Sequence, residues 1–442
     1  MTGDARKRWL TSLGAGLAAT AALLAAGSAP AAQAAPGGET RPQVRPQARA
    51  ETHEVEYFAG PDARPRHIEV RDSTHRTAAP ATAPVTPLQR TGPTSARLDL
   101  VVIGDGYTAS EQGDFTEDAR RSLDAILAIE PYRSYRGLFN IWLVEAASPA
   151  SGVSGDPTAD VTRDTALGSH FFCEEIERLL CVDTDAVTGL ANSAPAADIV
   201  FVIANSTKYG GAGYTFTTPP DGATYRGIAT MSSDNERSYL IGAHELGHSI
   251  GNLADEYQYA GYGAYPDPEA PDINLSTHRD LGTTKWHRWV GEQDPTGSAV
   301  GTYEGGGYYE TGVFRPTDTS IMRTLTSTEF NLVGREAMIA GFYAHADTLT
   351  SRTPTSAPIS RGTRLTVDLA PLTGLAAPRL TWYADGKRVD RATNDLSVTP
   401  AELGVRGRGP HTIRATVTDG SASLRDPSAL ASAANSLTWL LR

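Results

Sequence analysis

The residues with the clearest chemical potential lie in GAHELGHSIGNLADEY, residues 242–257. His244 and His248 stand four positions apart, so on a helix both imidazoles project from one face at a spacing that suits a single cation. Glu245 falls beside them, where its carboxylate can reach a metal-bound water without ligating the metal. Zinc lowers the pKa of such a water toward about 7, and an adjacent glutamate can take its proton. The pattern predicts a catalytic metal site, although His-Glu-x-x-His alone can be an ordinary exposed helix face.

The neighbouring residues strengthen the metal-site hypothesis. Gly251 stands three positions after His248, where a glycine lets the helix break and the chain double back toward the metal. An acidic pair, Asp255 and Glu256, follows at once. Met322, in DTSIMRT, lies downstream as the expected floor of the site, although a methionine among apolar residues is usually core filler.

Two tyrosines in YEGGGYYETG offer a further polar group. Tyr308 and Tyr309 lie just upstream of DTSIMRT and could supply a phenol to an oxyanion. Aromatic core packing explains each of them equally well.

The elements that must position these residues alternate between strands and helices. Residues 98–103 and the runs NIWLVEA and DIVFVIANS have the continuous apolar character of buried strands. A helical pattern follows GDGYT, and Asp234 or Asn235 can cap the helix that carries the histidines. We therefore expect an α/β (α+β) domain over residues 96–352, with a mixed, twisted sheet and an active-site helix.

The N-terminal residues are typical of an exported protein. Residues 1–34 have the pattern of a signal peptide, with a basic start, an apolar run over residues 10–26 and small residues at a cleavage site. Residues 35–95 hold a Pro/Gly-rich lead, the alternating segments HEVEYFAG and RHIEVRD, which predict a short hairpin, and a Pro/Ala/Thr linker. This unit is either a removable pro-segment or a subdomain of the enzyme.

The composition changes again over residues 356–442. RLTVDLAPL, RLTWYADGKRV, DLSVTP and HTIRATVTD are short alternating segments, with an Asp-Gly turn between Ala384 and Lys387. This pattern predicts a C-terminal immunoglobulin-like β-sandwich with Trp382 in its core. Packing, adhesion or substrate docking would be its role.

The chain has two cysteines, Cys173 and Cys181. Outside the cytosol, a pair this close usually forms a disulfide. An unbroken helix would hold the two residues roughly 12 Å apart, beyond bridging distance, so the chain must bend between them. A second metal site is the less favoured alternative, because no partner motif accompanies the thiols.

Length and charge narrow the class of protein. At 442 residues the chain is expected to form two or three domains. The net charge of −12 argues against nucleic acid or an anionic membrane as partner, and no segment after the signal peptide is apolar enough to span a bilayer. We expect a secreted monomer whose partner is a protein or peptide substrate.

Several segments resemble the igalysin family, the bacterial immunoglobulin A peptidases of the metzincin clan of zinc peptidases. They are LVVIGDGYTASEQ, ANSTKYGGAGY, HELGHSIGNLADEY, KWHRW and YEGGGYYETGVFRPTDTSIMR. The resemblance implies a metzincin-like catalytic domain with a Met-turn, in which Met322 packs beneath the zinc ligands. It also implies that the last strand before the helix is a sheet edge to which an extended peptide substrate adds.

The third metal ligand is where this chain departs from the general clan pattern. Ala254 stands where most metzincins place a third histidine, and alanine cannot bind a metal. The resemblance implies an aspartate, Asp255, although Glu256 could reach from one residue further on. Asp255 is preferred because a short carboxylate after a bend is better fixed, and the unused acid would then hydrogen-bond a ligand histidine. His287, in KWHRW, is a weaker candidate, since its flanking tryptophans suggest a packed structural histidine.

The residues and the resemblance together predict a secreted zinc endopeptidase. Glu245 would be its general base, and His244, His248 and Asp255 would hold Zn²⁺. A binding or adhesion module with a structural or vestigial metal is the alternative: four protein ligands would favour structure, and an open position would favour catalysis. A zinc hydrolase of non-peptide amides or glycans is a third possibility. The family name reflects one founding activity, so immunoglobulin A is not assigned as the substrate.

Overall fold

The computed structural model describes residues 52–71, 82–216, 225, 227–374 and 378–442. The predicted signal peptide and the lead that follows it lie outside the described residues, as do residues 77–81 of the predicted Pro/Ala/Thr linker. Within the described ranges, no helix combines the length and the apolar character that a bilayer crossing requires.

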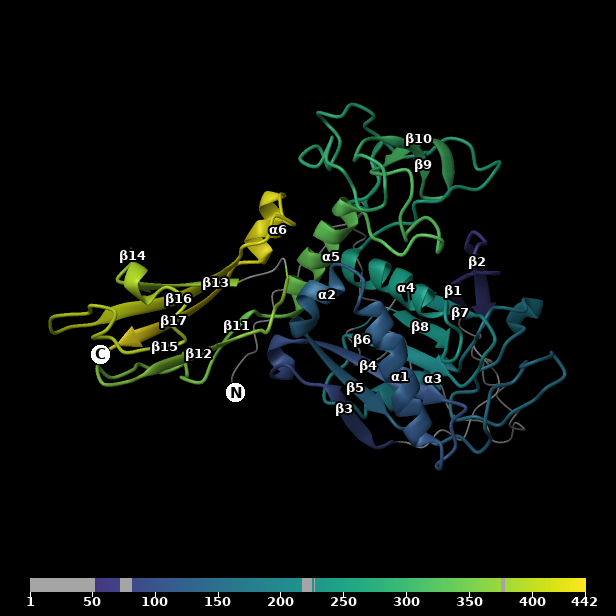
Figure 1. The fold of residues 1–442 in the computed structure, drawn as a ribbon, viewed down its shortest axis with the longest axis horizontal. Helices are drawn as coiled ribbons and strands as arrows, with labels where there is room; N and C mark the ends of the chain where they lie inside the picture. The colour runs from purple at the N-terminus through teal and green to yellow at the C-terminus, as the bar shows by residue number, and fades with distance from the viewer. Residues whose placement is uncertain (1–51, 72–81, 217–224, 226, 375–377) are drawn as a thin grey trace, which may run out of the picture. The chain divides into compact units, whose positions relative to one another are not determined.

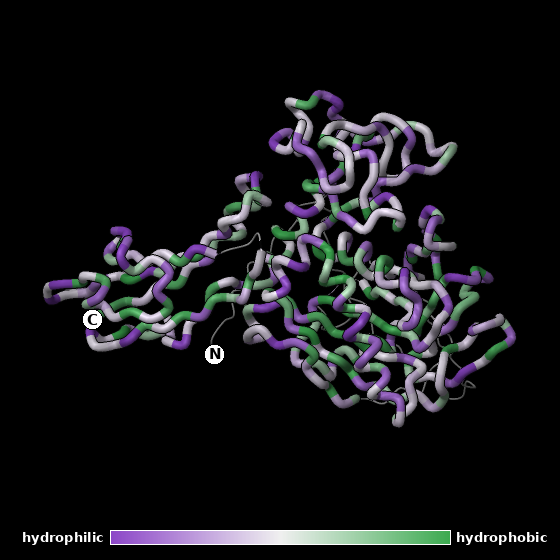
Figure 2. The backbone as a smooth tube through the Cα atoms, viewed as in Figure 1, coloured by the Kyte–Doolittle hydropathy of each residue, from purple (hydrophilic) through white to green (hydrophobic). Residues whose placement is uncertain are grey.

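The largest element is an eight-stranded mixed sheet with the order β2-β1-β7-β8-β6-β4-β5-β3 (Figure 1). In its parallel centre, β6 (Ile199–Ala204) lies between β4 (Leu98–Asp105) and β8 (Gly227–Ser232), and β4 also pairs with β5 (Phe139–Val144). At one edge, β3 (Val85–Gln89) is antiparallel to β5. Strands β4 and β6 are buried along their length and mostly apolar (Figure 2), as is typical of strands covered on both faces. The predicted mixed sheet is confirmed.

The other end of the sheet is antiparallel. There β7 (Gly211–Thr215) pairs with β8, β1 (Thr52–Tyr57) pairs with β7, and β2 (Arg66–Arg71) pairs with β1. The two alternating N-terminal segments do form a hairpin. However, the expectation that the last strand before the active-site helix is a sheet edge is wrong. That strand, β8, is internal, because β7 folds back antiparallel beside it and β1 covers β7 in turn.

Alternate residues of the central strands bury different helices on the two faces of the sheet. Leu100 and Val102 of β4 belong to the core that contains α1 (Gln112–Ile126), α4 (Tyr239–Gly251) and α5 (Leu332–His345). The intervening Val101 and Ile103 belong to a second core, which contains α3 (Thr184–Ala191) and the two cysteines. Helix α4, which carries the two histidines, is therefore held between the sheet and its neighbouring helices.

The start of α4 differs from the predicted one. The residue before the helix is Ser238, and its side chain makes no capping hydrogen bond. Asp234 is instead bound by Arg121, whose Nη2 lies 2.6 Å from Asp234 Oδ1. Asn235 Oδ1 accepts from the backbone N–H of Arg237 in a tight turn. These local contacts compete with capping, so the prediction that either residue caps the helix is wrong.

The C-terminal part contains two small sheets with one shared core. Its three-stranded sheet has the order β11-β12-β15 and its four-stranded sheet the order β14-β13-β16-β17. Trp382 lies in the shared core as predicted, stacked on Trp439 with ring centroids 5.7 Å apart. Strand β11 pairs with β12, so this unit begins inside the range expected for the preceding domain. Two sheets around one core agree with a sandwich, while the immunoglobulin-like topology stays a prediction.

The strands of these two sheets are β11 (Leu349–Ser351), β12 (Leu365–Leu369), β13 (Pro378–Ala384), β14 (Lys387–Arg388), β15 (Ser397–Val398), β16 (His411–Asp419) and β17 (Asn435–Leu441). The other short elements of the described residues are β9 (Tyr303–Gly306), β10 (Tyr309–Arg315), α2 (Tyr132–Tyr135), α6 (Pro427–Ser432), η1 (Thr94–Ala96), η2 (Arg136–Leu138), η3 (Cys173–Glu175) and η4 (Asp390–Ala392).

Candidate metal centre

Helix α4 presents His244 and His248 on one face, as their four-residue spacing requires. His244 Nδ1 lies 2.9 Å from the carbonyl oxygen of Ile321, and His248 Nδ1 lies 2.6 Å from that of Leu253. Because a carbonyl oxygen only accepts, each Nδ1 carries the hydrogen and each Nε2 is directed into the site. The two Nε2 atoms lie 3.0 Å apart.

The turn after α4 brings the following acidic residues back toward the histidines. Asn252 has a left-handed φ of 46°, and its N–H reaches the carbonyls of the last helical turn. The prediction that Gly251 makes this break is wrong by one residue, since asparagine also tolerates the left-handed region. Gly251 is needed for another reason: a Cβ there would lie 2.7 Å from Met338 Sδ of α5.

Asp255 is the acid that this turn carries to the imidazoles. Its Oδ1 lies 3.2 Å from His244 Nε2 and 3.5 Å from His248 Nε2. The Glu256 carboxylate is directed elsewhere and accepts hydrogen bonds of 2.6 to 3.0 Å from Ser320, Asn331 and Asn274. The expectation that the unused acid bonds a ligand histidine is therefore wrong, because two amides and a hydroxyl hold it inside the protein.

A fourth side chain, not anticipated from the sequence, reaches the same point from strand β1. Glu56 Oε2 lies 3.4 Å from His244 Nε2 and 3.3 Å from His248 Nε2. Tyr257 Oη donates a 2.9 Å hydrogen bond to the other carboxylate oxygen, Oε1. One donor atom from each of Glu56, His244, His248 and Asp255 lies within 4.8 Å of all the others. The only signal in the sequence was the hairpin pattern around Glu56, which does not say where the hairpin packs.

The separations within this group fit a divalent ion in tetrahedral coordination. Ligand atoms about 2.0–2.1 Å from zinc at tetrahedral angles lie roughly 3.3 Å from one another. The five donor–donor distances that involve a histidine nitrogen run from 3.0 to 3.5 Å. In the described part of the chain, Asp255 Oδ1 accepts no hydrogen bond although it is buried. Two buried carboxylates and two imidazoles thus form a donor set that suits a cation.

The electrostatics of the group agree with this reading. Burial alone would lower the pKa of His244, but the charges of Glu56 and Asp255 outweigh burial and raise it to about 10. Burial and Asp255 would raise the pKa of Glu56, yet the two imidazoles lower it to about 2. The carboxylates therefore create a negative potential around the imidazole nitrogens, and a bound divalent ion would replace the protons that this potential attracts.

Glu245 lies beside the four donors without being one of them. Its Oε1 is buried and has no hydrogen-bond partner among the described residues. Its Oε2 lies directly against strand β7, where a Cβ on Gly213 would be only 1.8 Å away. Burial and the nearby Glu56 carboxylate raise the pKa of Glu245 to about 8. A carboxyl group with this pKa can exchange a proton near neutral pH, which suits a general acid–base role.

Met322 lies beneath α4, where the Met-turn was expected. A Cβ on Gly247 would be 2.5 Å from Met322 Sδ, so the sulfur packs directly against the helix backbone. The carbonyl of Met322 accepts a 2.8 Å hydrogen bond from the backbone N–H of Glu256. Met322 thus supports both the helix and the acidic turn from below.

Of the two tyrosines that precede Met322, only one reaches the site. Tyr308 Oη donates a 2.8 Å hydrogen bond to Asp255 Oδ2. Tyr309 packs edge-on against Tyr265, with ring centroids 5.2 Å apart. Tyr308 therefore orients the Asp255 carboxylate. A second phenol, that of Tyr257, which no sequence motif indicated, holds Glu56.

His287 does not contribute to this group. Its side chain is exposed, whereas the neighbouring Trp286 and Trp289 are buried. Both the metal-ligand candidacy and the interpretation of His287 as a packed structural histidine are wrong, because its side chain is exposed and it does not belong to the group of potential ligands.

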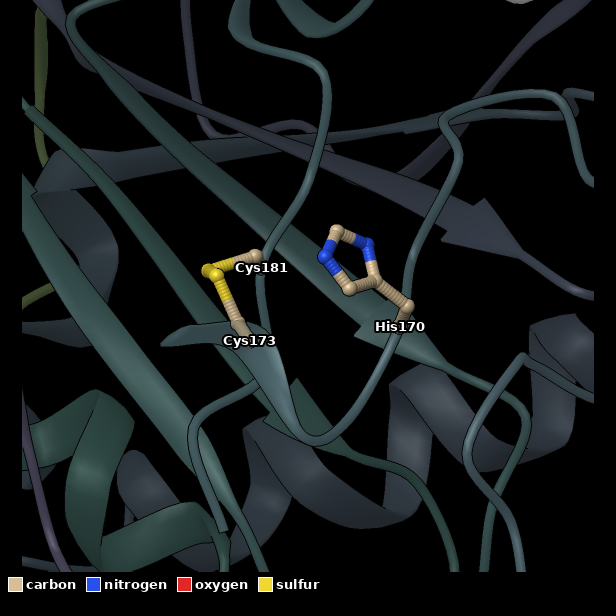
Figure 3. A group of neighbouring side chains, drawn as sticks. All are labelled: His170, Cys173 and Cys181. Carbon is tan, nitrogen blue, oxygen red and sulfur yellow. A yellow bond between two sulfur atoms is a disulfide. The ribbon is translucent and has the colours of Figure 1, made fainter. Parts of the chain in front are cut away.

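Three further potential ligands, His170, Cys173 and Cys181, form a second group (Figure 3). The two cysteines belong to the core on the face of the sheet opposite to α4. Cys173 and Cys181 form a disulfide, with Cα atoms 5.9 Å apart. The chain does not continue as a helix between them, since Glu174 and Glu175 both have positive φ and His170 and Cys181 exchange two backbone hydrogen bonds. The predicted disulfide and bend are both present.

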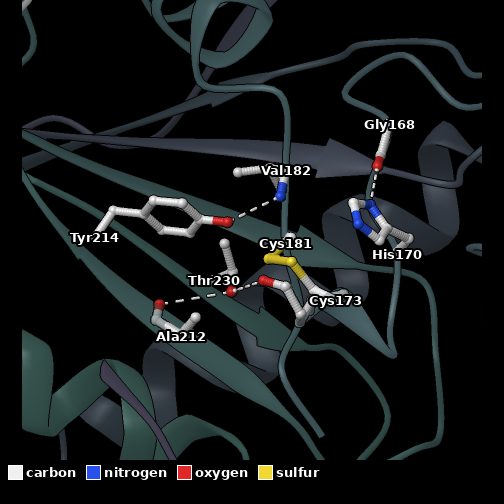
Figure 4. The surroundings of a disulfide bond; sticks show 9 residues. Gly168, His170, Cys173, Cys181, Val182, Ala212, Tyr214 and Thr230 are labelled. Carbon is white, nitrogen blue, oxygen red and sulfur yellow. Dashed lines mark hydrogen bonds between the residues drawn. A yellow bond between two sulfur atoms is a disulfide. The ribbon is translucent and has the colours of Figure 1, made fainter. Parts of the chain in front are cut away.

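Polar groups around the disulfide also make hydrogen bonds within the protein (Figure 4). Tyr214 Oη accepts a hydrogen bond from the backbone N–H of Val182, which follows Cys181. His170 Nδ1 lies 2.9 Å from the carbonyl of Gly168. The cysteines are joined to each other, so this group has no thiolate to offer a metal.

The sequence matches the family model of IgA Peptidase M64 over residues 86–297 and 293–342, which together span more than half of the chain. With the site described above, this match defines the class of protein: a peptidase with a possible metal-binding group. The chain belongs to the IgA peptidase M64 family, as the resemblance had indicated. No curated protein matches it. The matched residues include α4 and the acidic turn but begin after the β1–β2 hairpin.

Proposed function

We propose that the protein is a secreted, zinc-dependent endopeptidase in which His244, His248 and Asp255 hold the metal and Glu245 is the general base. The observation that carries this proposal is the position of Glu245 beside four donors at tetrahedral separations, in a chain of a peptidase family. When bound, zinc would polarise the scissile carbonyl and lower the pKa of water.

The protein's own residues would orient these groups and move the proton. The carbonyls of Ile321 and Leu253 hold the two imidazoles with Nε2 directed inward, and Tyr308 holds Asp255. Glu245 Oε1, buried and without a hydrogen-bond partner in the described structure, would take the proton of the attacking water and pass it to the leaving amine. The absence of a side chain at Gly213 leaves the space that the Glu245 carboxylate occupies.

The proposal extends to where the protein works. The pattern of residues 1–34 supports export by a signal peptide, and the disulfide is typical of an oxidising compartment. The substrate would be an extracellular protein or peptide, cleaved by a monomer, with a C-terminal immunoglobulin-like unit that assists packing, adhesion or docking. The immunoglobulin A in the family's name is not assigned to this chain.

One observation favours the alternative of a binding or adhesion module with a structural metal. Glu56 completes a set of four protein donors, and a closed four-ligand set is typical of structural zinc. A structural metal would keep Glu56 as a permanent ligand, whereas catalysis requires Glu56 to leave the metal.

Mass-spectrometric profiling of cleavage in a complex peptide library tests the proposed function. The zinc-loaded full chain is expected to cleave peptides, to stop when a chelator removes the metal, and to recover on addition of zinc. Glu245→Gln should bind zinc and not cleave, while Glu236→Gln, an exposed glutamate in the turn before α4, should behave like the wild type. A folded protein that takes up no zinc, or a fully active Glu245→Gln variant, would contradict the proposal.

A further inference from the structure

We infer that the N-terminal hairpin is a displaceable plug: Glu56 takes the fourth position around the metal, β1 occupies the pairing edge of β7, and substrate reaches the metal only in the fraction of molecules in which the hairpin has left. This inference rests on the proposed function, since it requires a metal held by His244, His248 and Asp255.

The position of Glu56 is that of a ligand. Its Oε2 lies 3.3 and 3.4 Å from the two imidazole Nε2 atoms, against 3.2 and 3.5 Å for Asp255 Oδ1. Both carboxylates are buried. A catalytic zinc site keeps one position for water or substrate, so the position that Glu56 takes is the one that catalysis would need.

The backbone of the hairpin occupies the strand edge nearest to this position. Residues 54–57 of β1 pair antiparallel with β7, and Glu56 is directly opposite Gly213. Gly213 is also the residue against which Glu245 packs. An extended peptide that paired with the same edge of β7 would therefore pass both Glu245 and the metal, and it cannot pair there while β1 does.

A second residue of the hairpin closes the site from strand β2. His67 Nε2 lies 3.0 Å from both Tyr257 Oη and Tyr308 Oη and 3.4 Å from Asp255 Oδ2. These are the phenols that hold Glu56 and Asp255. The hairpin thus contacts the candidate ligands through both of its strands.

The hairpin packs against the site on its inner side, while its outer strand is largely open to solvent. Phe58, which follows β1, is buried and packs edge-on against His244, with centroids 5.2 Å apart. Most of β2, in contrast, is exposed or half-buried at the outer edge of the sheet. The family match begins at residue 86, so the matched residues include Glu245 and the other three donors but not Glu56.

The test compares four full-length proteins loaded with zinc: wild type, Glu56→Ala, Glu56→Gln and Glu69→Gln. Glu69 is an exposed glutamate on β2 and provides the matched control. Calorimetry measures the dissociation constant of a peptide hydroxamate, which binds the metal itself. If the open state is populated at about 1–10%, wild type and Glu69→Gln should bind the hydroxamate about 10- to 100-fold more weakly than either Glu56 variant. Glu56→Gln serves if Glu56→Ala does not fold.

The visible spectrum of cobalt-loaded samples provides a measurement that needs no added hydroxamate. The visible spectrum should change between wild type and the Glu56 variants, because an oxygen ligand is lost and solvent replaces it, and should be the same for wild type and Glu69→Gln. Equal hydroxamate affinity in all four zinc-loaded proteins would overturn the plug. Loss of zinc by the Glu56 variants alone would make Glu56 a permanent ligand and would also overturn it. A wild-type chain that binds no zinc would instead overturn the proposed function.

Discussion

Two groups of potential metal ligands lie on opposite faces of the large sheet, and they differ in how their donors are satisfied. In one, Cys173 and Cys181 bond to each other and His170 Nδ1 lies at hydrogen-bond distance from a backbone carbonyl. In the other, Asp255 Oδ1 is buried and accepts no hydrogen bond in the described structure. Ligand-type residues at short distance therefore do not define a metal site by themselves. What distinguishes the second group is a pair of buried carboxylates whose oxygens face two imidazole nitrogens at the separations of metal ligands.

The largest effect should come from removing a donor of the second group. Asp255→Ala is expected to abolish zinc binding and hydrolysis, because two imidazoles and a displaceable carboxylate hold the ion poorly. Metal analysis by atomic emission checks the zinc content.

The neighbouring acid is the control for that experiment. Glu256→Gln should keep its zinc but lose about 1–3 kcal/mol of unfolding free energy, because an amide would face the donors that now bind the carboxylate. Thermal unfolding measures that loss. Zinc lost from Glu256→Gln and kept by Asp255→Ala would reverse the ligand assignment.

A change on strand β7 should affect the rate and spare the metal. In Gly213→Ala the new Cβ would need the place of Glu245 Oε2, so the carboxylate must move. Displacing a reacting group by about 1 Å can cost roughly 10²-fold, and kcat/KM is expected to fall by about that factor at unchanged zinc content. If Gly213→Ala keeps the wild-type kcat/KM, the position of the Glu245 carboxylate does not matter for the rate.

A smaller effect on the metal should follow from the phenol that holds Asp255. Tyr308→Phe removes the hydrogen bond to Oδ2, and zinc affinity should fall about 10- to 100-fold, as for other groups that orient ligands. Competition with a chromogenic chelator measures the affinity. Tyr309→Phe is the matched control and should leave it unchanged; equal losses in both variants would count against an orienting role.

The first group should show no effect on the metal at all. Replacing Cys173 and Cys181 together by serine opens a short loop, which should reduce the unfolding free energy by about 2–3 kcal/mol, measured by denaturant titration. Zinc stoichiometry should stay at the wild-type value. A loss of zinc in this variant would mean that the two groups are not independent.

Much of the fold could be predicted because the signals are local. Continuous apolar runs indicated the central strands, and alternation indicated the β1–β2 hairpin and the strands of the C-terminal sheets. The predictions were wrong where other contacts compete. Asp234 pairs with Arg121 and does not cap α4. The left-handed residue that ends α4 is Asn252, where the sequence had pointed to Gly251. Local propensity does not include the groups that a distant element brings close.

The candidate site divides in the same way. The helical repeat by itself places His244 and His248 on one face. The eight-residue interval between Cys173 and Cys181 means that a disulfide between them requires the chain to bend. Both predictions succeed because covalent geometry and backbone periodicity act over a few residues. The choice of Asp255 over Glu256 depends on the amides and the hydroxyl that surround Glu256. The arrival of Glu56 depends on the pairing of β1 with β7. Strand pairing joins residues without regard to their separation along the chain, so only the tertiary structure could bring residue 56 to the histidines.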